Sequence, residues 1–202
     1  GPRRRRLAVE GHALEPQPQR VPVDAGNDGG GKPPPVVARL PFPDDWRVLL
    51  ILDRNTDGLH GEAELAAFRA LPAFPQAGIA EIARLVLLGV MPALVDRDFA
   101  AFGRAVSAIQ ERVGTHFAPA QGGVFTCGRV GKIAHRLESF GASGIGQSSW
   151  GPTGFAFAPD QAAAQSMIRA LGVLENGVEI RVVSGRNHGA TISSKELGLV
   201  GS

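Results

Sequence analysis

The stretch GIGQSSWGPTGFAFA, residues 144–158, is the most informative part of this sequence for the fold, because its two halves favour different structures. GFAFA (154–158) alternates small and aromatic residues, and this period of two is typical of a β-strand. The preceding residues are rich in glycine, serine and threonine, and glycines allow unusual backbone angles and close approach. Backbone N–H groups in such a loop can form an anion-binding nest. We therefore predict a functional loop between the end of a helix and a strand.

Trp150 leaves two interpretations of this loop open. A large aromatic side chain among glycines either contacts a ligand or fills the core beneath a tight connection. The hydroxyl and amide groups beside it favour a ligand, because such groups donate and accept hydrogen bonds to polar substrates. The predicted substrate-binding residues are the loop and the glycines before it, namely Gly144, Gly146, Gln147, Ser148, Ser149, Trp150, Gly151, Pro152 and Thr153.

Hydrophobic periodicity outside this stretch predicts the remaining elements. RVLLILD (47–53) is a continuous apolar run of strand length, which is typical of a central strand. The segment 76–91 is mostly apolar, so we expect a buried helix that ends at Pro92. The other predicted strands are 36–40, 154–158 and 178–183, and the other predicted helices are 62–71, 97–113, 129–140 and a segment that begins at Pro159 and Asp160.

The order of these elements favours one fold class. Two strands come first, a run of helices follows, and a strand, a helix and a strand complete the pattern. Because strands and helices do not alternate strictly, we predict an α+β fold with a mixed or antiparallel sheet covered by helices on one face. We place this domain at 36–187, after an irregular arm rich in arginine, glycine and proline (1–35) and before a C-terminal tail (188–202).

Composition excludes several classes of protein. The 202 residues are 44% hydrophobic and 20% charged, which is enough for one sizeable core or two small ones. A net charge of +2 favours neither nucleic acid nor a membrane surface, and no apolar run reaches the roughly 18 residues that span a bilayer. The single cysteine, Cys127, excludes an internal disulfide and a cysteine-rich metal site. We expect a cytoplasmic protein whose partners are small-molecule substrates, and a homodimer stays open.

Two glycine-rich segments look like phosphate loops, but neither has the complete pattern. In GNDGGGKP (26–33), Pro33 replaces the serine or threonine whose hydroxyl should hold magnesium. In GRVGKI (128–133), Ile133 stands at that position and the glycine spacing is wrong. We therefore predict no nucleotide site of this type.

The segment DRNTDGLHGEAE (53–64) fits the calcium loop of an EF-hand. The oxygen ligands would come from the side chains of Asp53, Asn55, Asp57 and Glu64. Against calcium, the residues before the loop predict a buried strand rather than an entering helix, and no second loop occurs in the sequence. The competing interpretation is a strand-to-helix connection in which Asp, Asn and Gly turn the chain.

Arg186 follows the last predicted strand together with Asn187 and His188. These polar side chains either face a ligand or remain solvated at the end of the strand. The histidines show no catalytic arrangement by their spacing, so the sequence identifies no catalytic residue.

At GIGQSSWGPTGFAF (144–157) the chain resembles the C-terminal glycine-rich motif of the β-ribofuranosylaminobenzene 5′-phosphate synthases, a branch of the GHMP kinase superfamily. Two further regions resemble the family in the same order. They are PFPDDWRVLLILD with GLHGEAELAAF (41–53, 58–68), and MPALVDRDFAAFGRAVSAIQ with FAPAQGG (91–110, 117–123). The resemblance extends over residues 22–187, and QSSWGPT is specific to this branch.

The resemblance implies a GHMP-kinase C-terminal-like fold and a concrete reaction. The family joins 4-aminobenzoate, or a close relative such as 4-hydroxybenzoate, to phosphoribosyl pyrophosphate. A carbon–carbon bond forms, and carbon dioxide and pyrophosphate leave, in tetrahydromethanopterin biosynthesis. The implied cofactor is Mg²⁺ bound with phosphoribosyl pyrophosphate.

The resemblance also suggests roles for single residues. Loop N–H groups, Ser148 and Ser149 would stabilise the departing pyrophosphate. Trp150 would stack on the benzoate ring, and Arg186 would pair with a carboxylate or phosphate. The segment 58–64 would join a strand to a helix, so the calcium pattern would be coincidental, with the glutamates at the helix start.

The sequence departs from the superfamily in one respect. The first glycine-rich phosphate loop of the superfamily, in its N-terminal domain, has no counterpart here, so we expect an N-terminally truncated chain. Two alternatives remain. One is an ATP-dependent GHMP small-molecule kinase, although QSSWGPT differs from the kinase loop, and the other is a calcium-binding module at 53–64.

Overall fold

The computed structural model describes residues 35–58 and 61–189. The chain divides into two compact units, 1–39 and 40–202, and the second contains all the described helices and strands. Residues 35–39 are irregular, so the strand predicted over 36–40 is wrong. Prolines at 35 and 41 flank this segment, and proline cannot donate to a strand ladder. Residues 1–34 of the predicted arm and residues 190–202 of the predicted tail lie outside the described residues.

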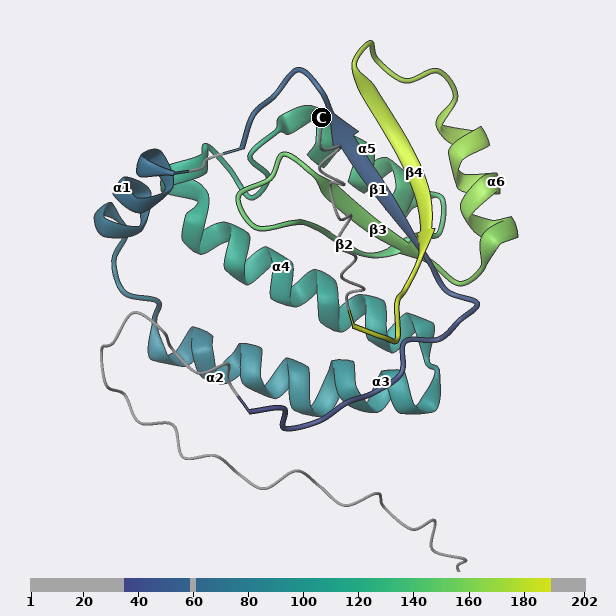
Figure 1. Cartoon of the computed structure of the whole chain (residues 1–202), viewed down its shortest axis with the longest axis horizontal. Coiled ribbons are helices and arrows are strands. Elements are labelled where there is room, and N and C mark those ends of the chain that lie inside the picture. Colours follow the sequence, from purple (N-terminus) through teal and green to yellow (C-terminus); the bar gives the residue numbers. More distant parts are fainter. Residues whose placement is uncertain (1–34, 59–60, 190–202) are drawn as a thin grey trace, which may run out of the picture. The chain divides into compact units, whose positions relative to one another are not determined.

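Four strands form one antiparallel sheet (Figure 1). Their order is β2-β3-β1-β4, so the run 47–53 is an inner strand, as predicted. At one end of the sheet Ile51 pairs with Gly154 and Ile180, and at the other end Arg47 pairs with Ala158 and Ser184. The strands are β1 (Arg47–Asp53), β2 (Ser143–Gln147), β3 (Gly154–Ala158) and β4 (Val178–Ser184).

The strand β2 was not predicted, and it changes the setting of the glycine-rich loop. The sequence pattern placed this loop between a helix and a strand, whereas the structure makes it the tip of a hairpin between β2 and β3. Two of the five residues of β2 are glycines, so they add no side chain to the alternation that marks a strand.

Helices account for most of the remaining described residues (Figure 1). Helices α5 and α6 pack on one face of the sheet, and α4 lies alongside β2. The α+β class with an antiparallel sheet is thus confirmed. The helical segments are α1 (Glu62–Ala70), α2 (Gln76–Leu85), the π-helical turn η1 (Val86–Val90), α3 (Met91–Asp96), α4 (Phe99–Gln121), α5 (Gly128–Ser139) and α6 (Gln161–Leu171).

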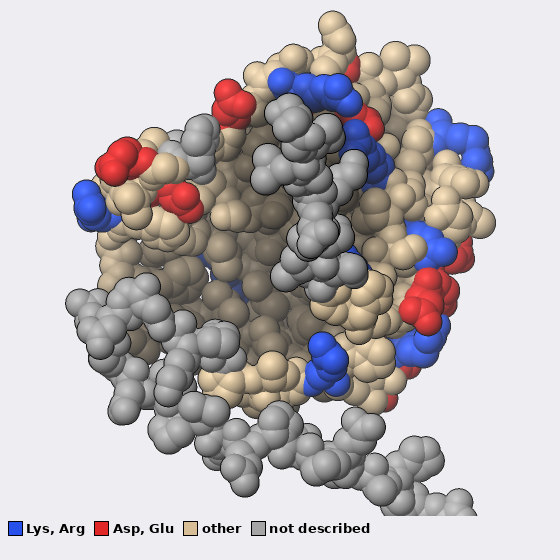
Figure 2. Space-filling model, viewed as in Figure 1, with Lys and Arg blue, Asp and Glu red and all other residues tan. Residues whose placement is uncertain are grey.

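The main core lies between the sheet and helices α5 and α6. Alternate residues of β1 and β3 point into it, and Leu49, Ile51 and Ala156 are fully buried against Leu137 of α5. The side chains on the opposite face of these strands are only partly buried. Where grey atoms do not cover it, the hollow of the face in Figure 2 is mostly tan, and charged side chains lie mainly around its rim.

The helix predicted over 76–91 is helical, but two expectations about it are wrong. It does not end at Pro92, because α3 continues to Asp96 after the π-helical turn η1. Proline removes a helical hydrogen bond and crowds the preceding turn, and the wider π turn before it relieves that crowding. The segment is also largely exposed, with Leu88 72% and Val95 65% accessible. Among the described residues, Gln76–Asp96 is the one helical stretch that could span a membrane by its length and composition alone, although Glu81 and Arg84 interrupt its apolar residues.

Candidate functional site

The hairpin loop 148–153 is held by its own backbone. Ser148 donates its N–H to the carbonyl of Thr153 at 2.9 Å, and Gly151 donates to the carbonyl of Ser148 at 2.9 Å. Ser149 has φ 49° and Gly151 has φ 69°, so the chain reverses through two residues in the left-handed region. Glycine adopts this region without a steric penalty, which explains its place in the motif.

Several donors of this loop remain available for a ligand. The hydroxyls of Ser148, Ser149 and Thr153 make no hydrogen bond to any residue that the structure describes, and the same holds for the N–H groups of Ser149 and Trp150. Ser148 and Ser149 are exposed at the tip of the hairpin. Hydroxyl and N–H donors without an acceptor are groups that an anion such as phosphate can bind.

The side chain of Gln147 makes several hydrogen bonds within the protein. Its Oε1 accepts a hydrogen bond from the N–H of Thr126 at 2.8 Å. Its Nε2 donates to Gln121 Oε1 at 3.1 Å and to the carbonyl of Ser149 at 3.1 Å. The amide therefore links the loop to the C-terminal end of α4 and to the segment after it.

The outer edge of β2 is closed by side chains of α4. Ser107 accepts from the N–H of Ile145 at 3.1 Å, and Gln110 accepts from the N–H of Gln147 at 3.1 Å. An unpaired strand edge would invite another strand, and these two side chains satisfy it locally. A Cβ at Gly146 would lie 2.4 Å from Gln110, so glycine is what allows α4 to approach this closely.

Trp150 is buried, with 5% of its surface accessible. Its ring contacts Phe117 of α4 at a centroid distance of 4.9 Å and Phe68 of α1 at 5.2 Å, both edge to face. The indole thus fills the space beneath the loop and offers no free face on which a benzoate ring could stack. The sequence left two interpretations of Trp150 open, and in the structure its side chain fills the core beneath the loop.

The segment after β1 passes directly beneath the loop. A Cβ placed on Gly58 would lie 2.3 Å from the carbonyl oxygen of Gly151. Both contacting groups belong to the backbone, so no side-chain rotation can relieve the overlap.

Replacing Gly58 by alanine is therefore expected to displace the loop and to destabilise the fold by about 1–3 kcal/mol, the usual range for an overpacked site. Amide chemical shifts of residues 148–153 and the free energy of unfolding would measure the two effects. Gly128→Ala is the matched control, because nothing lies within 4 Å of a Cβ at that position. Unchanged loop shifts in Gly58→Ala would contradict this contact.

Asp53 lies at the same end of the sheet and has a fully buried side chain. Arg129 of α5 donates to both carboxylate oxygens, at 2.9 Å and 2.7 Å. Thr56 donates to Oδ2 at 2.9 Å, and the Cys127 sulfur lies 3.1 Å from the same oxygen. Burial alone would raise the pKa of Asp53, but hydrogen bonds from Cys127, the Asn55 N–H and Thr56, together with the charge of Arg129, hold it below its usual value.

These contacts use side chains that a calcium loop would need as ligands. The carboxylate of Asp53 is satisfied by a guanidinium, and the side chain of Asn55 donates to the carbonyl of Asn176 at 2.9 Å. Glu64 lies on α1, where its acidic charge suits the first turn of the helix. The segment is a strand-to-helix connection, although its residues 59 and 60 are outside the described part.

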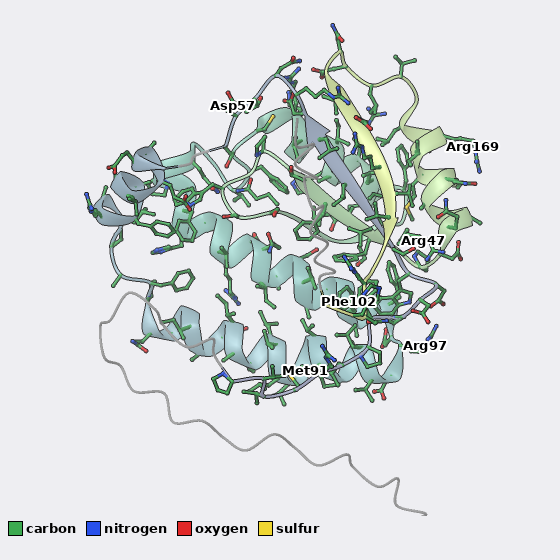
Figure 3. The ribbon with its side chains drawn as sticks, in the orientation of Figure 1. Arg47, Asp57, Met91, Arg97, Phe102 and Arg169 are labelled. Atoms are coloured by element: carbon green, nitrogen blue, oxygen red, sulfur yellow. The ribbon has the colours of Figure 1, made fainter. Side chains whose placement is uncertain are left out.

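The structure does not bring Arg186 to the loop. β4 runs from Val178, opposite Asp53, to Ser184, opposite Arg47, so Arg186 follows the far end of the sheet. Figure 3 shows Asp57 and Arg47 at these two opposite ends. Arg186 donates to His188 at 3.2 Å there. Arg129 binds Asp53 at the end of the sheet where the loop lies, whereas sequence analysis treated it only as the start of a helix.

Comparison with known proteins supports the resemblance inferred from the glycine-rich stretch. Residues 90–173 match the family described as GHMP kinases C terminal. The chain is 33% identical over 189 residues to the β-ribofuranosylphenol 5′-phosphate synthase of Archaeoglobus fulgidus, covering 92% of this chain and 56% of that protein. It is 27% identical over 180 residues to the synthase of the same name from Methanothermobacter thermautotrophicus, covering 89% of this chain and 52% of that one.

The chain therefore spans about half the length of the curated relatives it matches. Among solved structures it resembles homoserine kinase from Cytophaga hutchinsonii, with a TM-score of 0.50 and 20% identity. That likeness covers 73% of this chain and 44% of the kinase, and at this identity it concerns the fold alone. The predicted GHMP-kinase C-terminal-like fold is confirmed by these findings.

Proposed function

Because residues 90–173 match the family described as GHMP kinases C terminal, we propose that this chain is the phosphate-binding part of a β-ribofuranosylphenol 5′-phosphate synthase-like pentosyltransferase. Its substrate would be phosphoribosyl pyrophosphate, and its acceptor would be a para-substituted benzoate. The observation that carries the proposal is the exposed hairpin tip, where the hydroxyls of Ser148 and Ser149 and nearby N–H groups have no acceptor among the described residues.

In the proposed reaction the bond between ribose C1 and the pyrophosphate oxygen breaks, and C1 gains positive character. The ring carbon that bears the carboxylate attacks C1, and a carbon–carbon bond forms. The carboxylate then leaves as carbon dioxide, and its bonding electron pair restores the aromatic ring. Negative charge grows on the departing pyrophosphate, and fixed donors aimed at that charge lower the barrier. In this chain Ser148, Ser149 and the loop N–H groups would provide those donors.

Mg²⁺ would enter as part of the substrate. In the described part of the chain, no three His, Cys, Asp or Glu side chains are grouped to hold a metal. The ion would therefore be bound mainly by diphosphate oxygens, as is usual for magnesium that accompanies phosphates. The residues of this chain would contact the remaining oxygens.

The names of the relatives favour one acceptor over the other. Both relatives are named for a ribofuranosylphenol product, and a phenol carries a hydroxyl on its ring. We propose 4-hydroxybenzoate as the acceptor and 4-aminobenzoate as the competing candidate. The portion of the relatives that has no counterpart here would complete the site, so full turnover would require that portion in addition to this chain.

Calorimetric titration of the 202-residue chain with Mg²⁺ and phosphoribosyl pyrophosphate tests the phosphate site. The wild-type chain is expected to bind saturably, and the double variant Ser148→Ala, Ser149→Ala is expected to bind about tenfold more weakly or worse. Each lost hydrogen bond to a charged group costs roughly 1.5–3 kcal/mol. Ser166→Ala is the matched control, because this serine is exposed on α6, away from the hairpin.

Three outcomes would contradict the proposal or redirect it. A folded chain that binds neither phosphoribosyl pyrophosphate nor pyrophosphate would contradict a phosphate site at this loop. Equal binding by the double variant and wild type would place the phosphates elsewhere. Binding of ATP in preference to phosphoribosyl pyrophosphate would favour the small-molecule kinase instead.

A further inference from the structure

The connection between α4 and α5, residues 122–127, lies against the hairpin loop. It begins at Gly122, which has φ 85° and ends α4, and it reaches Cys127, which precedes α5. Within it, Thr126 makes two short hydrogen bonds to the hairpin. Its N–H donates to Gln147 Oε1 at 2.8 Å, and its hydroxyl donates to the carbonyl of Trp150 at 2.8 Å. Sequence analysis did not single out this threonine.

The N–H of Thr126 decides which end of the Gln147 amide faces the loop. A backbone N–H can only donate, so the side-chain atom beside it must be the amide oxygen. The Nε2 end therefore faces the hairpin tip, where it donates to the carbonyl of Ser149 at 3.1 Å. Gln121 Oε1 and the Thr126 hydroxyl are also within reach of Nε2, at 3.1 Å and 3.2 Å. Thr126 thus acts on two loop carbonyls, on that of Trp150 directly and on that of Ser149 through Gln147.

Fixing a carbonyl also fixes an N–H group, because the C=O and N–H of a trans peptide unit lie in one plane and point in opposite directions. The carbonyl of Ser149 and the N–H of Trp150 belong to one trans unit. Since Gln147 holds the carbonyl of this unit, the N–H of Trp150 points away from Gln147.

A relay fixes a second N–H group in the same way. Thr126 holds the carbonyl of Trp150, whose peptide unit also contains the N–H of Gly151. That N–H donates to the carbonyl of Ser148 at 2.9 Å, and this carbonyl shares its unit with the N–H of Ser149. The N–H groups of Ser149 and Trp150, which have no acceptor among the described residues, therefore both belong to units whose carbonyl oxygens are held inside the protein.

The contact between Thr126 and the loop is close, and the hydroxyl is already used. A Cβ on Gly151 would lie 3.0 Å from the Cβ of Thr126 and 3.1 Å from its hydroxyl oxygen, so glycine is what allows this approach. The hydroxyl has one hydrogen, which the carbonyl of Trp150 accepts at the shortest distance. Thr126 therefore keeps no donor for a ligand, and any effect that it has on a ligand acts through the loop.

We propose that Thr126 is a positioning residue for the hairpin loop. Its hydroxyl, together with its hold on Gln147, keeps the N–H groups of Ser149 and Trp150 turned toward a bound phosphate group. This inference rests on the proposed phosphate site at the loop. Donors that are fixed in advance bind an anion without the cost of turning the backbone during binding, so loss of the Thr126 hydroxyl lowers affinity although Thr126 does not touch the ligand.

Thr126→Val in the full chain tests this role, because valine keeps the branched shape and the N–H of threonine but lacks the hydroxyl. The backbone N–H residual dipolar couplings of Ser149 and Gly151 are expected to change. Affinity for pyrophosphate with Mg²⁺, measured by calorimetric titration, is expected to fall about threefold to tenfold, since one hydrogen bond is lost. Thr126→Ser keeps the hydroxyl and should restore both properties to near wild-type values. Thr115→Val is the matched control, because it makes the same substitution at an exposed position of α4.

Gln147→Met tests the second link separately, and it tests the proposal even if Thr126→Val does not fold. Methionine has nearly the length of glutamine but no amide, so the carbonyl of Ser149 loses its donor. The largest change in dipolar coupling is expected at the N–H of Trp150, and binding of pyrophosphate should again weaken about threefold to tenfold.

Three results would each overturn this inference and leave the phosphate site standing. Unchanged couplings at residues 149–151 in Thr126→Val would show that the hydroxyl does not set the loop conformation. Changed couplings with wild-type affinity for pyrophosphate would show that the direction of these N–H groups does not matter to the anion. If Thr126→Ser behaved like Thr126→Val, the effect would belong to packing of the methyl group. Absence of pyrophosphate binding by the wild type, in contrast, would remove the phosphate site and this inference together.

Discussion

Replacing Arg129 by methionine is expected to lower the Tm of this chain by about 10 °C at neutral pH. The reason is the carboxylate that remains. Asp53 has a fully buried side chain, and Arg129 is the positively charged group that the structure shows bound to both of its oxygens. The thiol of Cys127 and the hydroxyl of Thr56 also contact it, but neither carries charge. Methionine keeps most of the apolar stem of arginine, so the charge is the main change.

The difference in Tm between the wild type and Arg129→Met is expected to change with pH in a definite direction. In the wild type the pKa of Asp53 is lowered in the folded state, so its stabilising contribution is present above its unfolded pKa, roughly 4, and is lost as pH falls through the folded value. In the variant, burial without a cation is expected to raise the pKa of Asp53 instead. The ionised Asp53 carboxylate then destabilises the variant fully at neutral pH, and this loss of stability decreases as the carboxyl is protonated at lower pH. The difference in Tm between the two proteins should therefore narrow from pH 7 to pH 4.5.

Two further variants separate charge from packing. Asp53→Asn combined with Arg129→Met removes both charges, and it is expected to recover much of the lost stability, since the buried uncompensated charge is then absent. Arg54→Met is the matched control. Arg54 pairs with Glu179 at 2.8 Å, but its side chain is 69% exposed, so its loss should change the Tm little. A double variant no more stable than Arg129→Met would show that packing, not charge, explains the loss.

Sequence patterns predicted the elements whose side chains repeat regularly. The apolar run 47–53, the alternation in GFAFA and the amphipathic stripe of α5 all correspond to observed elements with nearly the predicted bounds. Strand β2 was missed because glycine adds nothing to a pattern of side chains. The length of α4 was underestimated, since it continues through Pro119 to Gln121.

The site was predictable as a segment but not as a set of contacts. The glycine- and serine-rich motif marked the loop as a candidate, because its residue types are typical of anion-binding turns. The partners of that loop come from distant positions, such as Gln121 and Thr126 for Gln147. Asp53 and Arg129 are likewise 76 residues apart, and only the pairing of β1 and packing of α5 bring them together. No local pattern contains such information.

Trp150→Ala is expected to cost about 3–5 kcal/mol in the free energy of unfolding, the usual range for removing a buried large aromatic side chain. Trp150 joins three parts of the molecule, since it lies under the hairpin loop and contacts Phe117 of α4 and Phe68 of α1. α1 has no fully buried residue of its own. Without the indole ring, α1 should therefore lose its main anchor, and hydrogen exchange of its amides should approach that of an unprotected segment.

Trp46→Ala is the control that distinguishes this anchoring from general loss of stability. Trp46 is equally buried, at 3% accessible, but it packs at the other end of the sheet with Phe42 and Phe102. Both variants should be destabilised, whereas only Trp150→Ala should release α1 and weaken binding of phosphoribosyl pyrophosphate at the loop. The stability of Trp150→Phe should lie between that of Trp150→Ala and that of the wild type, because a smaller ring keeps part of the contact. If Trp150→Ala instead kept its stability and lost only affinity for 4-hydroxybenzoate, the indole would serve the ligand by stacking, and its packing under the loop would matter little to the fold.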